Sequence, residues 1–306
     1  MLIHFAPMQG YTEDSYRRFH HEIFGGVSDY YTPFIRLEHG EIRSKDIRDI
    51  RPEFNENVNI VPQIITNGAN EASTLIEKIK DYGYSRIDIN MGCPFPLQTR
   101  HGRGAGILPH PDKVKEICEV IKGSKDISFS IKMRLGLEDK NEYKLILPIL
   151  NNTPLKHITI HPRIGKQQYK GETDMESFCE FQELCEHNII YNGDIKSTED
   201  INRIVSLSNS KLTGIMIGRG LLARPSLAEE FNSKTHLTDS ELISKIKLLH
   251  DRLYEHFTHI IPGENQQLNK LRTFWDYLEP TIGRKAWKKI TKAGNMKNYL
   301  IAVNSI

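Results

Sequence analysis

The chain has 306 residues, of which 38% are hydrophobic and 26% charged, and its formal net charge is +2. This length suits one large domain with a smaller one attached, and the composition is ordinary for a water-soluble protein. No apolar run approaches the roughly 20 residues of a membrane span, and the N-terminus lacks the features of a signal peptide. The sequence therefore predicts a cytoplasmic protein with no membrane contact.

Short apolar segments in the first three quarters of the chain predict eight β-strands. They are Leu2–Ala6, Tyr30–Ile35, Ile60–Ile65, Arg86–Asn90, Ser128–Met133, His157–His161, Ile189–Asn192 and Gly214–Ile217. Amphipathic stretches between them, such as Glu71–Tyr82, Pro111–Ile121 and Thr198–Ser206, predict helices. Eight strand–helix units in roughly 230 residues predict a TIM (β/α)8 barrel, whose closed sheet has no exposed edge.

After about Pro225 the pattern changes to helices alone. The predicted helices are Asp239–His259, Glu264–Leu278, Arg284–Lys292 and Asn295–Val303. We therefore predict a barrel domain over residues 1–232 and a small all-α bundle over 238–306. From Asp239 onward, 11 Lys and Arg stand against 7 Asp and Glu, or +4, whereas the rest of the chain has 30 against 32, or −2. A polyanion would favour this basic tail, although a solvated helical surface would have the same composition.

The four cysteines are too few for a disulfide framework, and their spacing matches no zinc site, so no metal is predicted. Cys118, Cys179 and Cys185 lie in helix-like stretches and are expected to be buried apolar side chains. Cys93 differs, because it lies between a glycine and a proline just after a predicted strand.

Polar or glycine-rich residues follow seven of the eight predicted strands, where a TIM barrel builds its active site. Two of these turns, Asn192–Ile195 and Gly218–Leu221, come after the last two strands. Glycines there let backbone N–H groups approach an anion, and Arg219 adds a positive charge. The pair predicts a phosphorylated ligand, with plain tight turns as the alternative.

Six motifs at these strand ends together resemble the tRNA-dihydrouridine synthases. The motifs are Ala6–Glu13, Asp88–Pro94, Lys132–Gly136, His161–Arg163, Asn192–Ile195 and Met216–Gly220. They occur in the order found in that family and span the barrel, and the helical tail also suits the family's architecture. The most specific is the Asn-x-Gly-Cys-Pro sequence that ends at Pro94. The resemblance implies reduction of particular uridines in tRNA by bound FMN, with electrons from NADPH or NADH.

The resemblance also implies the residues that hold FMN. They are Pro7, Met8 and Gln9 along the ring, Gln63 and Lys132 at its edge, His161 near ring and phosphate, and Asn192, Gly193, Asp194, Gly218 and Arg219 at the phosphate. A cation such as Lys132 would stabilise the reduced, anionic ring. A solvated surface lysine is the alternative for Lys132, and an ordinary hydrogen-bonded histidine is the alternative for His161.

By the same resemblance, Cys93 is the proton donor. Hydride from the flavin would reach C6 of uracil, and the thiol would protonate C5. A thiol, with an ordinary pKa near roughly 8.5, is mostly protonated at neutral pH yet able to donate, so no strong thiolate-stabilising surroundings are expected. A buried structural cysteine is the alternative. Asn90 would bond the uracil edge, and Arg163 and Tyr169 would meet the nucleotide.

A uracil in folded tRNA must leave its stack to reach such a site, so the rest of the RNA must be held elsewhere. The basic tail is the expected holder, through Lys270, Arg272 and Tyr277, whereas Leu271 and Trp275 are expected in the bundle core. Together with Arg36, these polar residues resemble the short bacterial subgroup acting on uridine 16 of the D-loop. The glycine-rich run 100–106 predicts a mobile lid whose basic residues reach the RNA.

Three alternatives remain open from the sequence. They are an FMN barrel acting on a free pyrimidine, as dihydroorotate dehydrogenases do, a flavin-free phosphate-binding barrel such as an isomerase, and an RNA-binding protein without catalysis. No GxGxxG motif of a separate nucleotide-binding fold is present, so NADPH is expected to enter the flavin site itself. The protein is expected to be a monomer.

Overall fold

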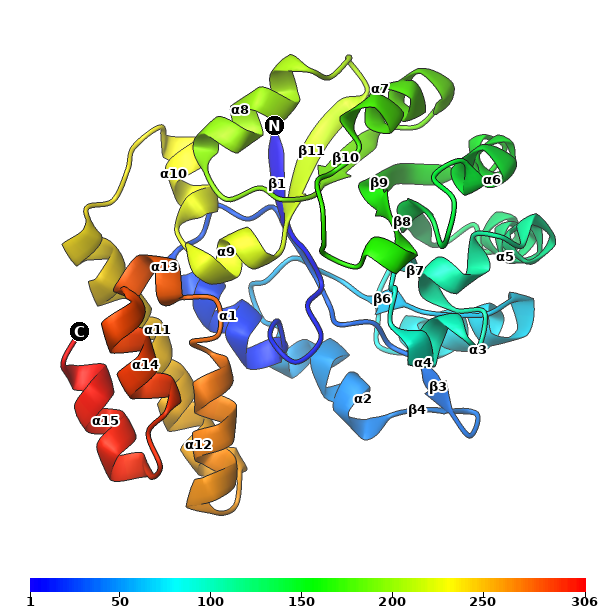
Figure 1. The fold of residues 1–306 in the computed structure, drawn as a ribbon. Helices are drawn as coiled ribbons and strands as arrows, with labels where there is room; N and C mark the ends of the chain where they lie inside the picture. The colour runs from blue at the N-terminus through cyan, green and yellow to red at the C-terminus, as the bar shows by residue number, and fades with distance from the viewer.

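The computed structural model describes all residues, Met1–Ile306, and confirms the TIM barrel (Figure 1). Its strands form one sheet of parallel neighbours in the order β5-β2-β1-β11-β10-β9-β8-β7-β6. The strands are β1 (Leu2–Phe5), β2 (Asp29–Tyr31), β5 (Ile60–Val61), β6 (Gln63–Ile64), β7 (Arg86–Met91), β8 (Ser128–Gly136), β9 (Leu155–Ile164), β10 (Ile189–Asn192) and β11 (Leu212–Ile217). A short hairpin, β3 (Leu37–Glu38) with β4 (Glu41–Ile42), was not predicted from the sequence.

The barrel closes through the third predicted strand, which is interrupted at Pro62. Its first half, β5, pairs with β2, and its second half, β6, pairs with β7. Proline has no N–H to donate to a ladder, which explains why one predicted strand becomes two. The second predicted strand is shorter than expected for the same reason, because Pro33 follows soon after β2.

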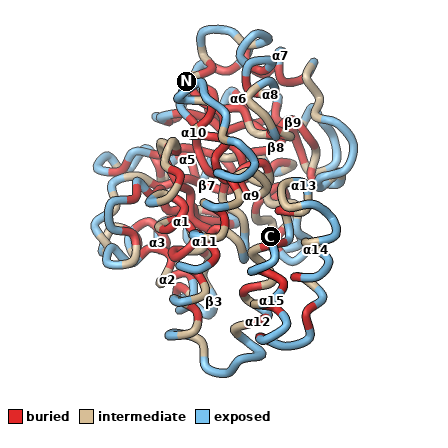
Figure 2. The backbone as a smooth tube through the Cα atoms, turned by 90° about the vertical axis from the view of Figure 1, so that its left-hand side faces the viewer, coloured by how far each residue is buried: buried red, intermediate tan, exposed pale blue.

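Helices cover the outside of the strands, and the strands are the most buried part of the chain (Figures 1 and 2). They are α1 (Asp14–Ile23), α2 (Ser44–Ile50), α3 (Ala69–Lys80), α4 (Pro96–Thr99), α5 (Pro111–Gly123), α6 (Glu142–Asn151), α7 (Met175–Leu184), α8 (Thr198–Ser206), α9 (Arg219–Ala223) and α10 (Leu227–Ser233), with 3-10 turns at Pro52–Phe54, Gly104–Ile107 and Gly165–Gln167. Cys118 and Cys185 are buried as expected. The same expectation for Cys179 is wrong, because Phe178 and Phe181 take the inner face of α7 and leave the thiol exposed.

Five helices form the tail: α11 (Asp239–Ile260), α12 (Glu264–Thr273), α13 (Glu279–Ile282), α14 (Arg284–Thr291) and α15 (Met296–Asn304). Thr238 and Glu241 cap α11 reciprocally, which fixes where it begins. Leu271 and Trp275 are fully buried, as expected for core residues. Buried side chains of barrel and tail form one continuous hydrophobic cluster, so the two parts share a core. No helix is both long and apolar enough to cross a membrane.

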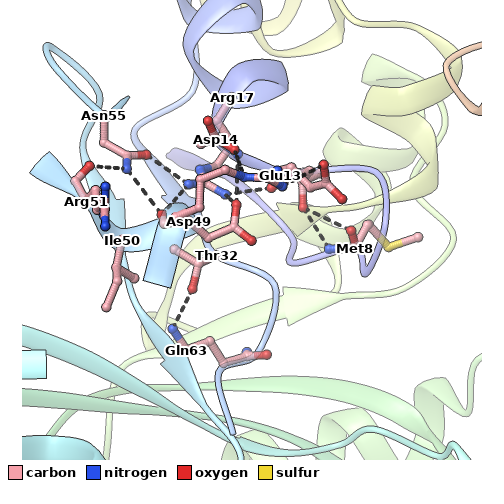
Figure 3. Close-up of polar contacts among 12 residues, drawn as sticks. Met8, Glu13, Asp14, Arg17, Thr32, Asp49, Ile50, Arg51, Asn55 and Gln63 are labelled. Carbon is pink, nitrogen blue, oxygen red and sulfur yellow. Dashed lines mark hydrogen bonds and ion pairs between the residues drawn. The ribbon is translucent and has the colours of Figure 1, made fainter. Parts of the chain in front are cut away.

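Arg17 on α1 ties the loop after β1 to the segment around α2 (Figure 3). Its side chain is fully buried and donates to the carbonyl oxygens of Thr12 and Asp49, both at 2.6 Å, and to Asn55 Oδ1 at 2.8 Å. Thr12 in turn accepts a hydrogen bond from the Met8 N–H at 2.9 Å. The conformation of the loop that begins at Met8 therefore depends on the buried Arg17 guanidinium, through Thr12.

We expect Arg17→Met to lower the free energy of unfolding by about 3–5 kcal/mol, because the change leaves the buried Asp49 carboxylate without its cation. Urea denaturation followed by circular dichroism measures this loss. Arg18→Met is the matched control, since the Arg18 guanidinium lies over the Phe19 ring and makes no ion pair, and should cost about 1 kcal/mol or less. Equal losses in the two variants would contradict the role of Arg17.

Candidate active site

A cavity of about 1340 Å³ lies among the loops that follow the strands. It brings together sixteen of the nineteen residues predicted for the site. They are Pro7, Met8, Gln9, Arg36, Gln63, Asn90, Cys93, Lys132, His161, Tyr169, Asn192, Gly193, Asp194, Gly218, Arg219 and Tyr277. Parallel strands of a closed barrel direct these loops to the same end, which explains the convergence.

The other three predicted residues do not line this cavity. Arg163 is buried beneath it, where the guanidinium donates to the Asp194 carboxylate and the Gly171 carbonyl oxygen. Lys270 forms an ion pair with Glu13 at 2.8 Å, which ties the tail to the loop after β1. Arg272 is half-buried and reaches only Asn269, at 3.5 Å. All three side chains therefore make contacts within the protein.

A chain of hydrogen bonds runs along the buried side of the cavity. Asp88 accepts from Ser130 Oγ at 2.6 Å and from Gln63 Nε2 at 2.7 Å. Gln63 Oε1 then accepts from Asn90 Nδ2 at 2.7 Å, and Asn90 Oδ1 accepts from the N–H of Cys93 at 2.8 Å. Burial raises the pKa of Asp88 to about 6, against the opposing effect of its hydrogen bonds. Asp88 thus orients Gln63 and Asn90, and through them the backbone of Cys93.

The Cys93 thiol lies half-buried in the wall of the cavity. Burial raises its pKa above the ordinary thiol value, although the Phe95 N–H and the cations Arg134 and Lys132 act in the opposite direction. The thiol is consequently protonated at neutral pH and can serve as an acid. This result agrees with the expectation that no strong thiolate-stabilising surroundings exist.

The glycine-rich run after Cys93 is packed against it. The Ala105 N–H donates to the Cys93 carbonyl oxygen at 2.9 Å, and a Cβ at Gly104 would lie only 2.6 Å from that oxygen. Arg103 forms an ion pair with Glu71 on α3. The expectation of a mobile lid with basic residues free to reach RNA is therefore wrong for Arg103, whose guanidinium anchors the run to the barrel.

Positive side chains dominate the electrostatics of the site. Burial and the neighbouring Arg134 lower the pKa of Lys132 to about 8, against the opposing effect of Asp88. Burial and the surrounding cations hold the pKa of His161 well below its ordinary range, so this ring is neutral. Arg134 was not predicted for the site, although it lies two residues after Lys132 on β8 and so on the same face of the strand. The Arg219 guanidinium lies over the Tyr169 ring, 4.5 Å from its centroid.

The loops after β10 and β11 meet at the cavity, where Arg219 forms an ion pair with Asp194 at 2.8 Å. The backbone N–H groups of Gly193 and Asp194 donate to no acceptor in the protein, and those of Arg219 and Gly220 lie in the first turn of α9, where a helix offers no acceptor. A Cβ at Gly220 would lie 2.0 Å from the Ile195 carbonyl oxygen, so the two loops meet this closely only because residue 220 is glycine. Unpaired N–H groups beside Arg219 are suited to a phosphate.

Comparison with known proteins identifies a family and several relatives of this chain. Residues 4–302 match the family model described as "Dihydrouridine synthase (Dus)". A tRNA-dihydrouridine(16) synthase of Neisseria meningitidis is 27% identical over 235 residues, which cover 74% of this chain and 69% of that protein. The tRNA-dihydrouridine synthase B of Pasteurella multocida is 30% identical over 228 residues, which cover 74% and 67%. A probable tRNA-dihydrouridine synthase of Aquifex aeolicus is 30% identical over 234 residues, covering 75% and 72%.

Solved structures with low sequence identity share the fold. A 2-naphthoyl-CoA reductase complex superposes with a TM-score of 0.58 at 10% identity and covers 76% of this chain and 50% of its own. Morphinone reductase superposes with a TM-score of 0.55 at 12% identity and covers 79% and 88%. At this identity the likeness supports the barrel architecture alone.

Proposed function

The chain belongs to the dihydrouridine synthase family, and on this premise we propose that it reduces uridines of tRNA to 5,6-dihydrouridine. The observation that carries the proposal is the protonated Cys93 thiol in the wall of a cavity of about 1340 Å³. This volume exceeds the range of roughly 300–1,000 Å³ usual for one small ligand, so a flavin and a nucleobase could enter together. The relatives named for tRNA support RNA, rather than a free pyrimidine, as the substrate.

The lining residues fit FMN as the cofactor. Its phosphate would take the unpaired N–H groups of Gly193, Asp194, Arg219 and Gly220. Gln63 and Lys132 would meet the edge of the ring, where a cation stabilises negative charge. Bound FMN would supply a hydride to C6 of uracil, and NADPH or NADH would restore it from the same cavity.

Cys93 would supply the proton that completes the reduction. Its S–H bond breaks as a C–H bond forms at C5 of uracil, and the resulting thiolate regains a proton from solvent. Lys132 and Arg134 stabilise this thiolate, since both lower the pKa of Cys93. Asn90 uses one amide hydrogen for Gln63, which leaves the other for a carbonyl oxygen of uracil. In this arrangement the protein orients the base and moves the proton.

We propose uridine 16 of the D-loop as the target, on the resemblance of Arg36 and the tail to the subgroup acting there and on the relative named for that position. Sequencing tRNA from cells that lack the protein tests this assignment. Dihydrouridine should disappear at position 16 and return when the gene is restored. Loss at another position would overturn the target alone, whereas no loss at any position would overturn the function.

The tail would hold the tRNA through α14 rather than through Lys270. Five exposed cations lie on or beside this helix, and among them only Arg284 comes within 4.0 Å of a carboxylate. They are Arg284, Lys285, Lys288, Lys289 and Lys292. Unpaired cations are available for phosphates, whereas the Lys270 ammonium is already neutralised by Glu13.

We expect the triple variant Lys285→Ala/Lys288→Ala/Lys289→Ala to weaken tRNA binding and to flatten its dependence on salt. Each lost phosphate contact should reduce the slope of log K against log salt by about 0.7–0.9. Filter binding at several salt concentrations measures both effects. A triple change of Lys113, Lys115 and Lys122 to alanine, on the exposed face of α5, alters the charge equally and should leave the slope unchanged. Equal slopes for the two triple variants would exclude α14 as the contact.

A further inference from the structure

Two exposed apolar side chains lie at the cavity immediately after the catalytic thiol. Phe95 is 56% exposed and Leu97 63% exposed, and both line the cavity. They belong to the four-residue stretch that follows Pro94 and begins α4. Side chains this apolar are costly to leave in water, and both lie in the cavity wall that also contains Cys93. Their position therefore points to an apolar surface on the incoming substrate.

This stretch is held rigidly. Pro94 and Pro96 fix the backbone on both sides of Phe95. The Phe95 carbonyl oxygen accepts from the N–H groups of Gln98 at 2.8 Å and Thr99 at 3.1 Å. The Phe95 N–H is directed at the Cys93 sulfur. The backbone of Phe95 consequently has a fixed place relative to the proton donor, and binding against its ring costs little ordering of the backbone.

Gln98 adds an unsatisfied polar group to the same wall. The residue is only 8% exposed and lines the cavity, and its Oε1 is buried without a hydrogen-bond partner. A buried polar atom without a partner is costly unless a ligand satisfies it. The carboxamide carries both a donor and an acceptor, which is the pattern that the edge of a nucleobase offers.

We infer that Phe95, Leu97 and Gln98 form a subsite for the nucleobase next to the uridine that enters the cavity. When a uridine leaves its stack, its neighbour loses one stacking partner, and the Phe95 ring with Leu97 replaces it. Gln98 bonds the edge of that base. Exposed Arg100 and His101 follow directly and suit the adjoining phosphates. This inference rests on the proposed function and adds a preference for sequence around the target.

The test combines changes in the protein and in the RNA. Phe95→Ala should raise KM for tRNA about tenfold, as expected for one lost base–aromatic stack, and leave flavin reduction by NADPH unchanged. tRNA transcripts with an abasic residue 5′ or 3′ of the target uridine identify the partner. For the wild type, one of these transcripts should have a KM about tenfold higher than intact tRNA. For Phe95→Ala, the same transcript and intact tRNA should have equal KM values. Gln98→Met should remove discrimination between bases at that same position.

Controls separate this subsite from other effects. Leu145→Ala removes a comparably exposed leucine, 59% exposed on α6 and outside the cavity, and should behave as wild type. Phe95→Tyr keeps the ring and should restore a normal KM. The inference would be overturned if Phe95→Ala and the abasic residue raised KM independently of each other. A rise in KM for NADPH instead of tRNA would also overturn it. Wild-type protein that forms no dihydrouridine would overturn the proposed function instead.

Discussion

Cys93→Ala should bind FMN and accept electrons from NADPH normally, yet convert uridine at least about 100-fold more slowly. General acids contribute on the order of 10²–10⁴ to a rate, and alanine at position 93 has no proton to donate. Anaerobic mixing of the reduced protein with tRNA measures this step alone, through reoxidation of the flavin. Cys179→Ala removes an exposed thiol outside the cavity and should leave the rate unchanged. Normal turnover by Cys93→Ala would refute the assigned role.

The pH dependence of the same step supplies a second measurement. The reaction requires the protonated thiol, and burial raises the pKa of Cys93. The rate should therefore remain flat through neutral pH and fall only above roughly 8.5, the ordinary pKa of a thiol. Lys132, with a pKa of about 8, loses its charge over a neighbouring range. The slow residual reaction of Cys93→Ala should still vary in rate as Lys132 loses its proton. It should no longer show the fall in rate caused by ionisation of the thiol.

Gly220→Ala should yield protein that no longer retains FMN. The added Cβ would lie 2.0 Å from the Ile195 carbonyl oxygen, so the loops after β10 and β11 must separate. Hydrogen bonds to a charged group contribute about 1.5–3 kcal/mol each. Loss of two of them at the phosphate corresponds to at least about 100-fold weaker binding. Absorbance of the purified protein near the flavin maximum and titration with FMN measure the effect.

The control for this variant is a second glycine with room for a methyl group. Gly123 ends α5 and has no atom within 4 Å of a Cβ built on it. Gly123→Ala should bind FMN as the wild type does. Thermal unfolding of both variants without FMN shows whether Gly220→Ala remains folded, with an expected overpacking cost of about 1–3 kcal/mol. Full flavin content in Gly220→Ala would exclude these loops as the phosphate site.

The hydrogen-bonded chain from Asp88 to Cys93 explains why a buried acid belongs to this site. Asp88 lies within a motif that the sequence marks, yet it is fully buried and does not line the site cavity. Its carboxylate accepts a hydrogen bond from Gln63 Nε2, so Gln63 Oε1 faces Asn90 and accepts from its amide. The buried Asp88 thus sets the orientation of both amides, and therefore which of their atoms face the cavity.

Much of this architecture was predictable from the sequence. Eight alternating strand–helix units favour a barrel, because closing a parallel sheet of this size leaves no edge strand exposed. Glycines and polar residues after the strands also mark the site, since the carboxyl ends of all strands meet at one end. Cys93 is recognisable because Gly92 and Pro94 place it in a turn directly after β7.

Other features were decided by tertiary structure alone. The sequence marks Arg163, Lys270 and Arg103 as cations, but only folding shows that Asp194, Glu13 and Glu71 neutralise them. Their partners are distant in the chain, and charge pairing depends on distance in space rather than on spacing in the sequence. For the same reason the raised pKa of the Cys93 thiol, which results from burial, could not be read from the residues beside it.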